Sequence, residues 1–257
     1  MADFIYDILI SAPQAALQFL TIVPAISRKA FKPKDLSNST AYYPLIGALI
    51  GISLLVVNFV LEDYLPISIR STIILALWVG ISGAIHLDGF LDSCDGIFGG
   101  TTPERRLEIM HDEHIGAYAL SGGILLLLLK FTLLGSLLQD YPPYYLILAP
   151  ALGRWGMTFA IFGYKYARPR GLGRRIKDNM HWQQFTVSTI SALLIGVITA
   201  GWIGLVCFGV AGLLTFIVAH FTMRRIHGLT GDVYGAINEL TELATLLTYL
   251  LLFSAFS

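Results

Sequence analysis

The chain has 257 residues, with 17 basic and 17 acidic side chains, so its formal net charge is zero. Charged residues make up only 13% of the chain, whereas hydrophobic residues make up 55%, and the mean hydropathy is +0.69. A soluble core of this size could not bury so much apolar surface, which excludes a soluble enzyme, a disordered chain and a secreted disulfide scaffold. The neutral balance also argues against nucleic acid as a partner. The composition therefore predicts a polytopic membrane protein.

Several stretches are long and apolar enough to span a membrane, which takes about 20 residues in a helix. In chain order, the predicted spans are 42–61, 70–90, 117–138, 144–163, 184–200, 203–222 and 239–256. Gly201 is the predicted turn between two of them. Segment 4–26 is interrupted by Pro13, Gln14 and Gln18, so it either spans or lies in the membrane interface. We predict an all-α polytopic integral membrane helix bundle with seven or eight transmembrane helices, forming a single domain over residues 1–257.

Basic residues indicate the orientation of these helices. The loops 27–41, 91–116, 164–183 and 223–238 hold 14 of the 17 lysines and arginines. They alternate with short loops that hold none, and basic loops of membrane proteins lie on the cytoplasmic side. We therefore expect these four loops in the cytoplasm of a bacterial cell, with the protein in its cytoplasmic (inner) membrane. Acidic residues precede the first apolar segment, so we expect no cleaved leader.

The densest acidic cluster is HLDGFLDSCDG, over residues 86–96. Asp88, Asp92 and Asp95 have the spacing i, i+4 and i+7, so on a continuous helix they lie within about 60° of one another. Three carboxylates on one face repel each other unless a cation lies between them, and oxygen ligands suit Mg²⁺. A solvated helix end is the alternative, but ionisable groups at a membrane boundary are costly. We predict all three as catalytic residues and metal ligands.

A second acidic cluster, GLTGDVYGAINELTE over 228–242, begins the last predicted span. Asp232 and Glu239 are seven residues apart and share a helical face, and Asn238 adds an amide oxygen. Asp232 also suits a helix start, so a capping role stays open. Because both clusters belong to the predicted cytoplasmic face, we expect them to converge. Asp232, Asn238 and Glu239 are then predicted to bind substrate, with Asp232 also a metal ligand.

A third polar stretch, MHDEHIGAYA over 110–119, precedes another span. Asp112 and His114 lie just before that span. His111 and His114 are three residues apart and could ligate a transition metal, although the surrounding carboxylates favour a hard cation.

Three arginines are candidates for gripping an anionic substrate. Arg105 and Arg106 are either clamps for a polyphosphate or part of a solvated amphipathic helix. Arg154 lies inside the predicted span 144–163, where a charge is costly and therefore points to function. Pairing with a buried acid is the structural alternative for Arg154. We include all three among the predicted substrate-binding residues.

These clusters resemble the motif blocks of a known family, cobalamin 5′-phosphate synthase, also called adenosylcobinamide-GDP ribazoletransferase. The segments that carry the resemblance are FLTIVP (19–24), YYPLIGALIG (42–51), HLDGFLDSCDG (86–96), MHDEHIGAYA (110–119), LGRWGM (152–157) and GLTGDVYGAINELTE (228–242). The resemblance covers nearly the whole chain. One departure is that Glu113 and His114 stand where the family usually has serine and arginine, so His114 would replace that arginine as a phosphate contact.

The resemblance implies a transferase that acts late in cobalamin biosynthesis. Such an enzyme joins the phosphate-linked corrinoid of adenosylcobinamide-GDP to α-ribazole, or to α-ribazole 5′-phosphate, and releases GMP. It implies a need for Mg²⁺, held at Asp88, Asp92 and Asp95, together with a catalytic role for Asp112 and substrate binding by His114. We select Asp95 as the general base. Membrane lipid is the expected surrounding, and the oligomeric state stays open.

Two other functions fit part of the pattern. A CDP-alcohol phosphotransferase of phospholipid synthesis also uses aspartates at a membrane boundary, and Asp92-Ser93-Cys94-Asp95-Gly96 matches the start of its pattern. The rest of that pattern is missing. A secondary transporter would place ionisable groups near the membrane centre, often within inverted repeats. Only Arg154 favours this, and no repeat is visible.

Overall fold

The computed structural model describes residues 10–24 and 31–256, which are almost entirely helical. In chain order the elements are α2 (Ala12–Leu20), α3 (Pro33–Ser39), the 3-10 helix η2 (Thr40–Tyr42), α4 (Tyr43–Leu61), α5 (Ile67–Ile81), α6 (Ile85–Gly99), α7 (Pro103–Ile109), α8 (Ala117–Asp140), α9 (Tyr145–Gly163), α10 (Leu172–Asn179), α11 (Trp182–Ile226) and α12 (Gly231–Phe256). The predicted all-α membrane architecture is confirmed.

Within the described residues, five helices are long and apolar enough to cross a membrane, or six if α5 and α6 form one bent span. That count takes α11 as one helix, although the predicted spans 184–200 and 203–222 are its two limbs on either side of Gly201. Segment 4–26 contributes only the nine-residue α2, and its remaining residues lie partly outside the described ranges.

Helix α11 doubles back on itself at the glycine predicted as a turn. Gly201 has φ 56° and ψ −129°, a conformation open mainly to glycine. A side chain added at Gly196 would lie 3.2 Å from the carbonyl oxygen of Gly204. Eight residues of straight helix would separate these positions by about 12 Å. The two limbs of α11 therefore pack against each other, and the predicted turn at Gly201 is confirmed.

The predicted span 70–90 is broken between α5 and α6. Gly83 and Ala84 both have positive φ values, of 62° and 58°, and the two helices meet at 86°. The left-handed conformation is unfavourable for alanine, so the surrounding structure must hold Ala84 in it. As a result, the acidic cluster lies on α6, whose axis runs nearly at a right angle to that of α5.

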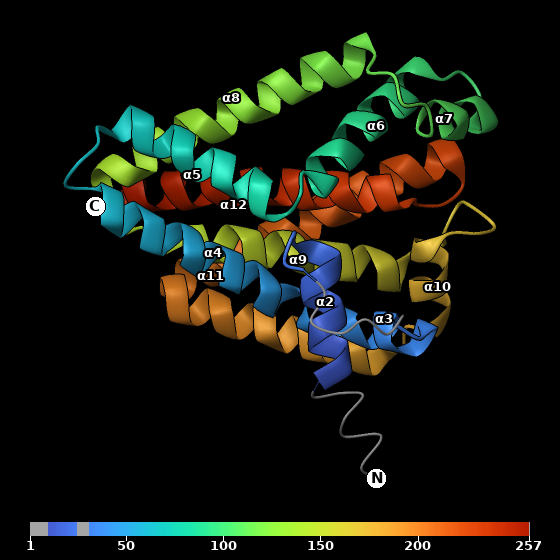
Figure 1. The fold of residues 1–257 in the computed structure, drawn as a ribbon, viewed down its shortest axis with the longest axis horizontal. Helices are drawn as coiled ribbons and strands as arrows, with labels where there is room; N and C mark the ends of the chain where they lie inside the picture. Colours follow the sequence, from blue (N-terminus) through green and yellow to red (C-terminus); the bar gives the residue numbers. More distant parts are fainter. Residues whose placement is uncertain (1–9, 25–30, 257) are drawn as a thin grey trace.

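Helix α9 forms the centre of the bundle. It packs against α4, α11 and α12. In its most apolar 18-residue stretch, 78% of the residues are buried, compared with 28% in that of α8. Helix α12 lies between α6 and α8 on one side and α9 and α11 on the other (Figure 1). Large apolar side chains on the outer faces of α8 and α11 are exposed, including Leu125, Ile198 and Leu213. Such an exposed apolar surface suits contact with lipid.

Candidate active site

Two glycines allow α6 to approach α12 closely. A Cβ atom at Gly89 would lie 2.7 Å from the carbonyl oxygen of Asp232, and one at Gly235 would lie 2.9 Å from that of His86. Neither position can carry a side chain without moving a backbone. This close crossing brings the first turns of α6 beside the start of α12, and so places Asp88 next to Asp232.

An isolated bridge fixes the loop after α9 beside the same point. Tyr166 and Leu229 pair in parallel, and the Ala167 amide donates to the Leu229 carbonyl oxygen at 2.8 Å. The next residue is Arg168, whose Nη2 donates to Oδ2 of Asp232 at 3.1 Å. Arg168 is not among the predicted site residues, because membrane topology alone accounts for its basic segment. The pairing with the turn before α12 was not visible in the sequence.

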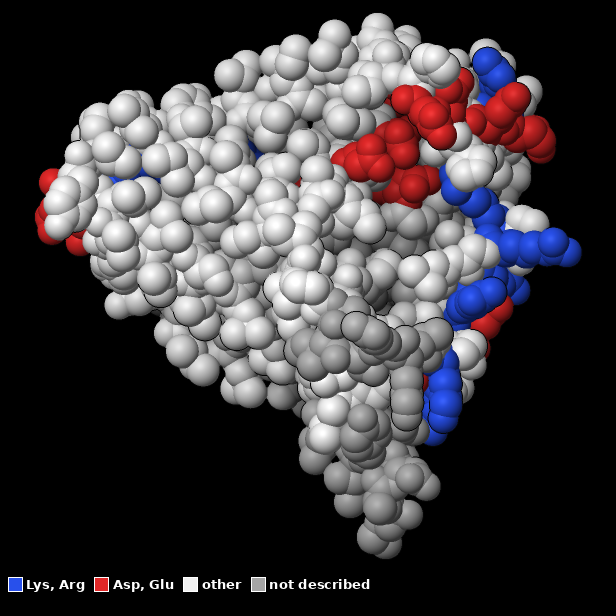
Figure 2. All heavy atoms as spheres, viewed as in Figure 1, with Lys and Arg blue, Asp and Glu red and all other residues white. Residues whose placement is uncertain are grey.

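These elements surround a cleft of about 370 Å³ at one end of the molecule. Its charged lining consists of Asp88, Asp92, Asp95, Asp112, Glu113 and Asp232, together with Arg168. Figure 2 shows that charged side chains gather at this end, with an acidic area next to a basic one. The structure thus brings together all four aspartates predicted as catalytic and Asp232 from the second cluster.

The cleft carries a large excess of negative charge. Asp92 is half-buried, and the charges of Asp88, Asp232 and Asp95 act against its ionised form, opposed by Arg168. Like charges this close raise the free energy of the fully ionised site. A bound cation would relieve the repulsion, and carboxylate oxygens are the ligands that Mg²⁺ prefers.

The carboxylates of the cleft are not arranged as a preformed metal site. Within residues 10–24 and 31–256, no group of three His, Cys, Asp or Glu side chains is close enough to hold a metal ion. Asp88 and Asp92 are nevertheless one turn apart on α6, which puts their Cβ atoms about 5–6 Å from each other. The donor chemistry therefore fits a hard cation, whose binding would require these side chains to rotate toward one another.

Asp95 does not have the surroundings expected of a general base. It is buried, and its carboxylate accepts hydrogen bonds from the amides of Gly116, at 2.6 Å, and Ala119, at 2.9 Å. Asp95 therefore caps the first turn of α8 and ties α6 to it. With both oxygens occupied in this way, Asp95 is not the residue best placed to act as general base.

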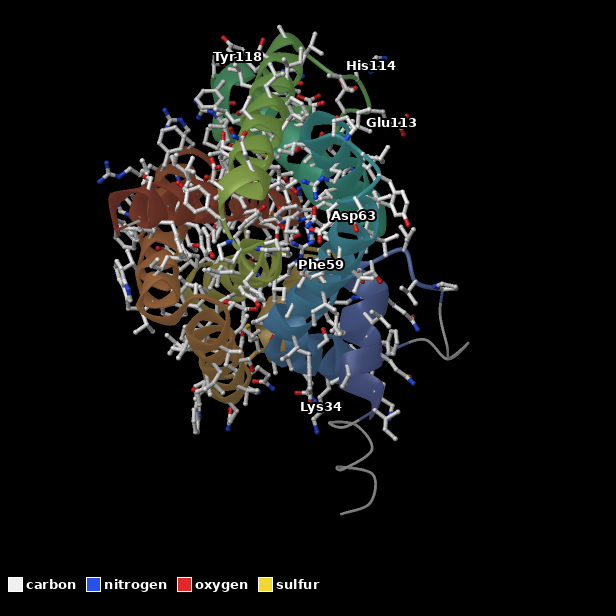
Figure 3. All side chains as sticks on the ribbon, turned by 90° about the vertical axis from the view of Figure 1, so that its left-hand side faces the viewer. Lys34, Phe59, Asp63, Glu113, His114 and Tyr118 are labelled. Atoms are coloured by element: carbon white, nitrogen blue, oxygen red, sulfur yellow. The ribbon has the colours of Figure 1, made fainter. Side chains whose placement is uncertain are left out.

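The loop between α7 and α8 forms the outer rim of the cleft. Glu113 and His114 point outward from the bundle (Figure 3). Nδ1 of His114 lies 2.6 Å from Oδ1 of Asp112, and this hydrogen bond lowers the pKa of the Asp112 carboxyl. Asp112 consequently stays ionised and is a weak proton acceptor. Among the described residues, His111 and His114 are not part of a metal-holding group.

The two arginines of α7 do not line the cleft. Arg105 is exposed and pairs with Glu108 at 2.6 Å, as expected of a solvated helix. The Arg106 guanidinium donates to the carbonyl oxygens of Ile97 and Arg225, both at 3.3 Å, and so joins α6, α7 and the end of α11. Arg105 thus fits the solvated-helix alternative and Arg106 has a structural contact, and their role as clamps for the substrate stays a prediction.

A second group of charges lies inside the bundle. Lys130 Nζ contacts Oε2 of Glu239 at 2.5 Å and Oε2 of Glu242 at 2.6 Å. Arg154 also pairs with Glu242, and Asn238 donates to Glu242 at 3.1 Å. All five residues are at most 4% exposed. We call Lys130, Arg154, Asn238, Glu239 and Glu242 the buried network.

The buried network changes the interpretation of three residues. Arg154, Asn238 and Glu239 were predicted to bind substrate, but none of them lines the cleft. Arg154 has the buried acid partner that was its structural alternative. Glu242, which is not among the predicted site residues, pairs with both Lys130 and Arg154.

Comparison with known proteins identifies the family. A family model described as cobalamin-5-phosphate synthase matches residues 13–250. The chain belongs to the cobalamin-5-phosphate synthase family.

Individual relatives agree with this assignment. The chain is 37% identical over 238 residues to an adenosylcobinamide-GDP ribazoletransferase of Pseudomonas syringae pv. syringae (strain B728a), covering 92% of this chain and 98% of the relative. Relatives described in the same way are 35% identical in Desulfitobacterium hafniense (strain Y51), with 90% and 93% covered, and 38% identical in Ectopseudomonas mendocina (strain ymp), with 92% and 97% covered. No solved structure matches the chain. The predicted family and its class, a transferase enzyme, are confirmed.

The structure shows where the family's motif segments lie in this member of the cobalamin-5-phosphate synthase family. Three of the motif segments, 86–96, 110–119 and 228–242, contribute to the cleft lining. Segment 152–157 instead lies in the buried core of α9 and contributes Arg154 to the buried network. The motifs therefore divide between the cleft and the network that joins the helices behind it.

Proposed function

We propose that this chain transfers the phosphate-linked corrinoid of adenosylcobinamide-GDP to α-ribazole or α-ribazole 5′-phosphate and releases GMP. The family assignment and the names of the relatives support this reaction. The observation that carries the proposal is the shared cleft, in which Asp88, Asp92 and Asp232 face Arg168. Carboxylates that can hold Mg²⁺, with an arginine for phosphate oxygens, are suited to phosphoryl transfer.

The bonds exchanged in this reaction define what the cleft must do. A ribose hydroxyl of the acceptor attacks the phosphorus that is linked to the corrinoid. The bond from that phosphorus to the oxygen bridging it to GMP breaks, and the hydroxyl proton passes to a carboxylate. Because α-ribazole 5′-phosphate has no free 5′-hydroxyl, an enzyme that accepts both acceptors must use a secondary hydroxyl.

We assign the roles of the chain's residues from their positions. Asp88, Asp92 and Asp232 would hold Mg²⁺, which when bound withdraws charge from the diphosphate and stabilises GMP as the leaving group. Arg168 would exchange its hydrogen bond with Asp232 for a phosphate oxygen of the donor. Asp95 would keep α8 in place beside these groups. Because a bound cation would lower the basicity of the carboxylates that hold it, the hydroxyl proton would pass to a carboxylate of the cleft that does not bind Mg²⁺.

We further propose that the protein lies in the bacterial cytoplasmic membrane with the cleft facing the cytoplasm. Helices α7 and α10 lie at the same end of the molecule as the acidic area (Figures 1 and 2). These helices belong to two of the four basic loops, and the positive-inside rule places such loops in the cytoplasm. Nucleotide-activated substrates would reach the cleft from that side.

The proposal is tested by incubating detergent-purified protein with adenosylcobinamide-GDP, each acceptor in turn, and Mg²⁺. Mass spectrometry should detect the cobalamin product together with GMP, and EDTA should abolish both until excess Mg²⁺ is restored. A folded sample that yields no product with either acceptor would refute the reaction. Product formation unchanged by EDTA would refute the metal dependence alone.

Replacing Arg168 by glutamine should weaken use of the phosphate donor. Loss of a charge-assisted hydrogen bond costs about 1.5–3 kcal/mol, so kcat/KM for adenosylcobinamide-GDP should fall roughly 10- to 100-fold. The matched control is Arg174→Gln, because Arg174 is paired with Asp178 on α10 and does not line the cleft. Equal kcat/KM values for the two variants would contradict the role assigned to Arg168.

A further inference from the structure

A second cavity, of about 280 Å³, adjoins the acidic cleft. The two share the side chains of Asp88, Arg168 and Asp232 as lining. A molecule that fills this second cavity therefore ends at the residues proposed to hold the metal ion and the donor phosphates. A ligand of the second cavity can thus present one of its groups to the phosphorus that reacts.

The walls of the second cavity are mainly apolar and aromatic, and its charged or ionisable lining is His86 and Arg170 besides the three shared residues. Phe19, Met157 and Ile161 contribute apolar side chains from α2 and α9. The rings of Tyr166 and Tyr234 also line it, with their centroids 6.2 Å apart. Such a lining suits a flat, weakly polar group, which gains from burial against aromatic rings.

Tyr234 adds a buried polar group to the wall of this cavity. Tyr234 is 3% exposed, and its hydroxyl has no hydrogen-bond partner. A buried hydroxyl without a partner is unfavourable, so most such groups are satisfied by water, by protein or by a ligand. Tyr234 also follows Asp232 by two residues at the start of α12, so it is fixed close to the mouth shared with the cleft.

We infer that the second cavity binds the nucleoside acceptor, with its base against Tyr166 and Tyr234 and hydrogen-bonded to the Tyr234 hydroxyl. This inference rests on the proposed function. The ribose would then point to the shared mouth, where Asp88 and Arg168 lie. The cavity is smaller than the roughly 300–1,000 Å³ typical of sites for drug-sized ligands, so it is too small for a corrin macrocycle.

The same lining distinguishes the acceptor from the guanosine of the donor. Guanine has several donors and acceptors along its edge, and the apolar side chains of Phe19, Met157 and Ile161 would leave those that face them unpaired, at a large cost in affinity. The benzimidazole base of ribazole is largely apolar and needs few hydrogen bonds. The cavity therefore favours the acceptor's base, and the donor's nucleotide is expected to lie on the cleft side of Arg168.

The test is Tyr234→Phe, which removes a single oxygen atom and leaves the ring in place. We expect KM for α-ribazole to rise about five- to tenfold, the effect of losing one hydrogen bond, while KM for adenosylcobinamide-GDP stays unchanged. Equilibrium dialysis of α-ribazole against protein without donor should show the same loss of affinity. Melting curves in detergent should show that the variant is folded.

The matched control is Tyr145→Phe. Tyr145 is also buried with an unpartnered hydroxyl, but it does not line the second cavity. This control should bind α-ribazole as the unchanged protein does. An unchanged KM for α-ribazole in Tyr234→Phe, or a rise confined to adenosylcobinamide-GDP, would overturn the inference while leaving the proposed function standing. Absence of product from the unchanged protein would instead overturn the proposed function, and this inference with it.

Discussion

Replacing Asp92 by asparagine is expected to reduce corrinoid transfer by at least 100-fold without affecting expression. The substitution keeps the size of the side chain but removes one negative charge from the cleft. If Asp92 helps to hold Mg²⁺, the loss weakens stabilisation of the charge that develops on the diphosphate, and each 1.4 kcal/mol lost lowers the rate about tenfold. Initial rates of GMP release by the purified variant measure this effect.

Asp63→Asn is the control for this prediction. Asp63 is an exposed aspartate near the loop between α4 and α5, and it does not line the cleft (Figure 3). Its variant should keep full activity. If Asp92→Asn retained more than about a tenth of the activity, the proposed metal-holding role of Asp92 would be refuted.

Replacing Lys130 by methionine is expected to destabilise the bundle strongly. Lys130 and Arg154 balance the buried carboxylates of Glu239 and Glu242, so the variant leaves one negative charge uncompensated. Breaking a buried ion pair from one side costs about 3–5 kcal/mol. We therefore expect the variant to unfold in detergent at a clearly lower temperature than the unchanged protein. Tryptophan fluorescence recorded during heating measures this temperature.

A double variant separates charge imbalance from loss of packing. Lys130→Met combined with Glu239→Gln removes one charge of each sign and should recover much of the stability lost in Lys130→Met. Double-mutant cycles of this kind isolate the coupling between contacting residues. Additive destabilisation by the two changes would show that Lys130 and Glu239 do not stabilise each other. The exposed Glu104→Gln should leave the unfolding temperature unchanged.

Local patterns predicted those parts of the site that depend on one helix. The spacing of Asp88, Asp92 and Asp95 placed them on one helical face, and all three line the cleft. Gly201 between two apolar stretches predicted the reversal of α11. In both cases the decisive information lies within a few residues, where helical periodicity and the conformational freedom of glycine apply.

Contacts between distant segments were not predictable in this way. Arg168 reaches Asp232 only because the loop after α9 pairs with the turn before α12. Arg154 meets Glu242 across 88 positions of sequence, so its charge alone could not distinguish pairing from substrate binding. The capping of α8 by Asp95 depends likewise on how the chain returns through α7.

The central claim, that the cleft holds a divalent cation, is tested most directly by Mn²⁺ binding measured with electron paramagnetic resonance. Mn²⁺ prefers oxygen ligands, as Mg²⁺ does, and its free and bound forms give different spectra. Detergent-purified protein should bind Mn²⁺, Mg²⁺ should displace it, and Asp92→Asn should weaken binding at least tenfold while Asp63→Asn does not. Mn²⁺ binding of equal affinity in the unchanged protein and in Asp92→Asn would contradict the account.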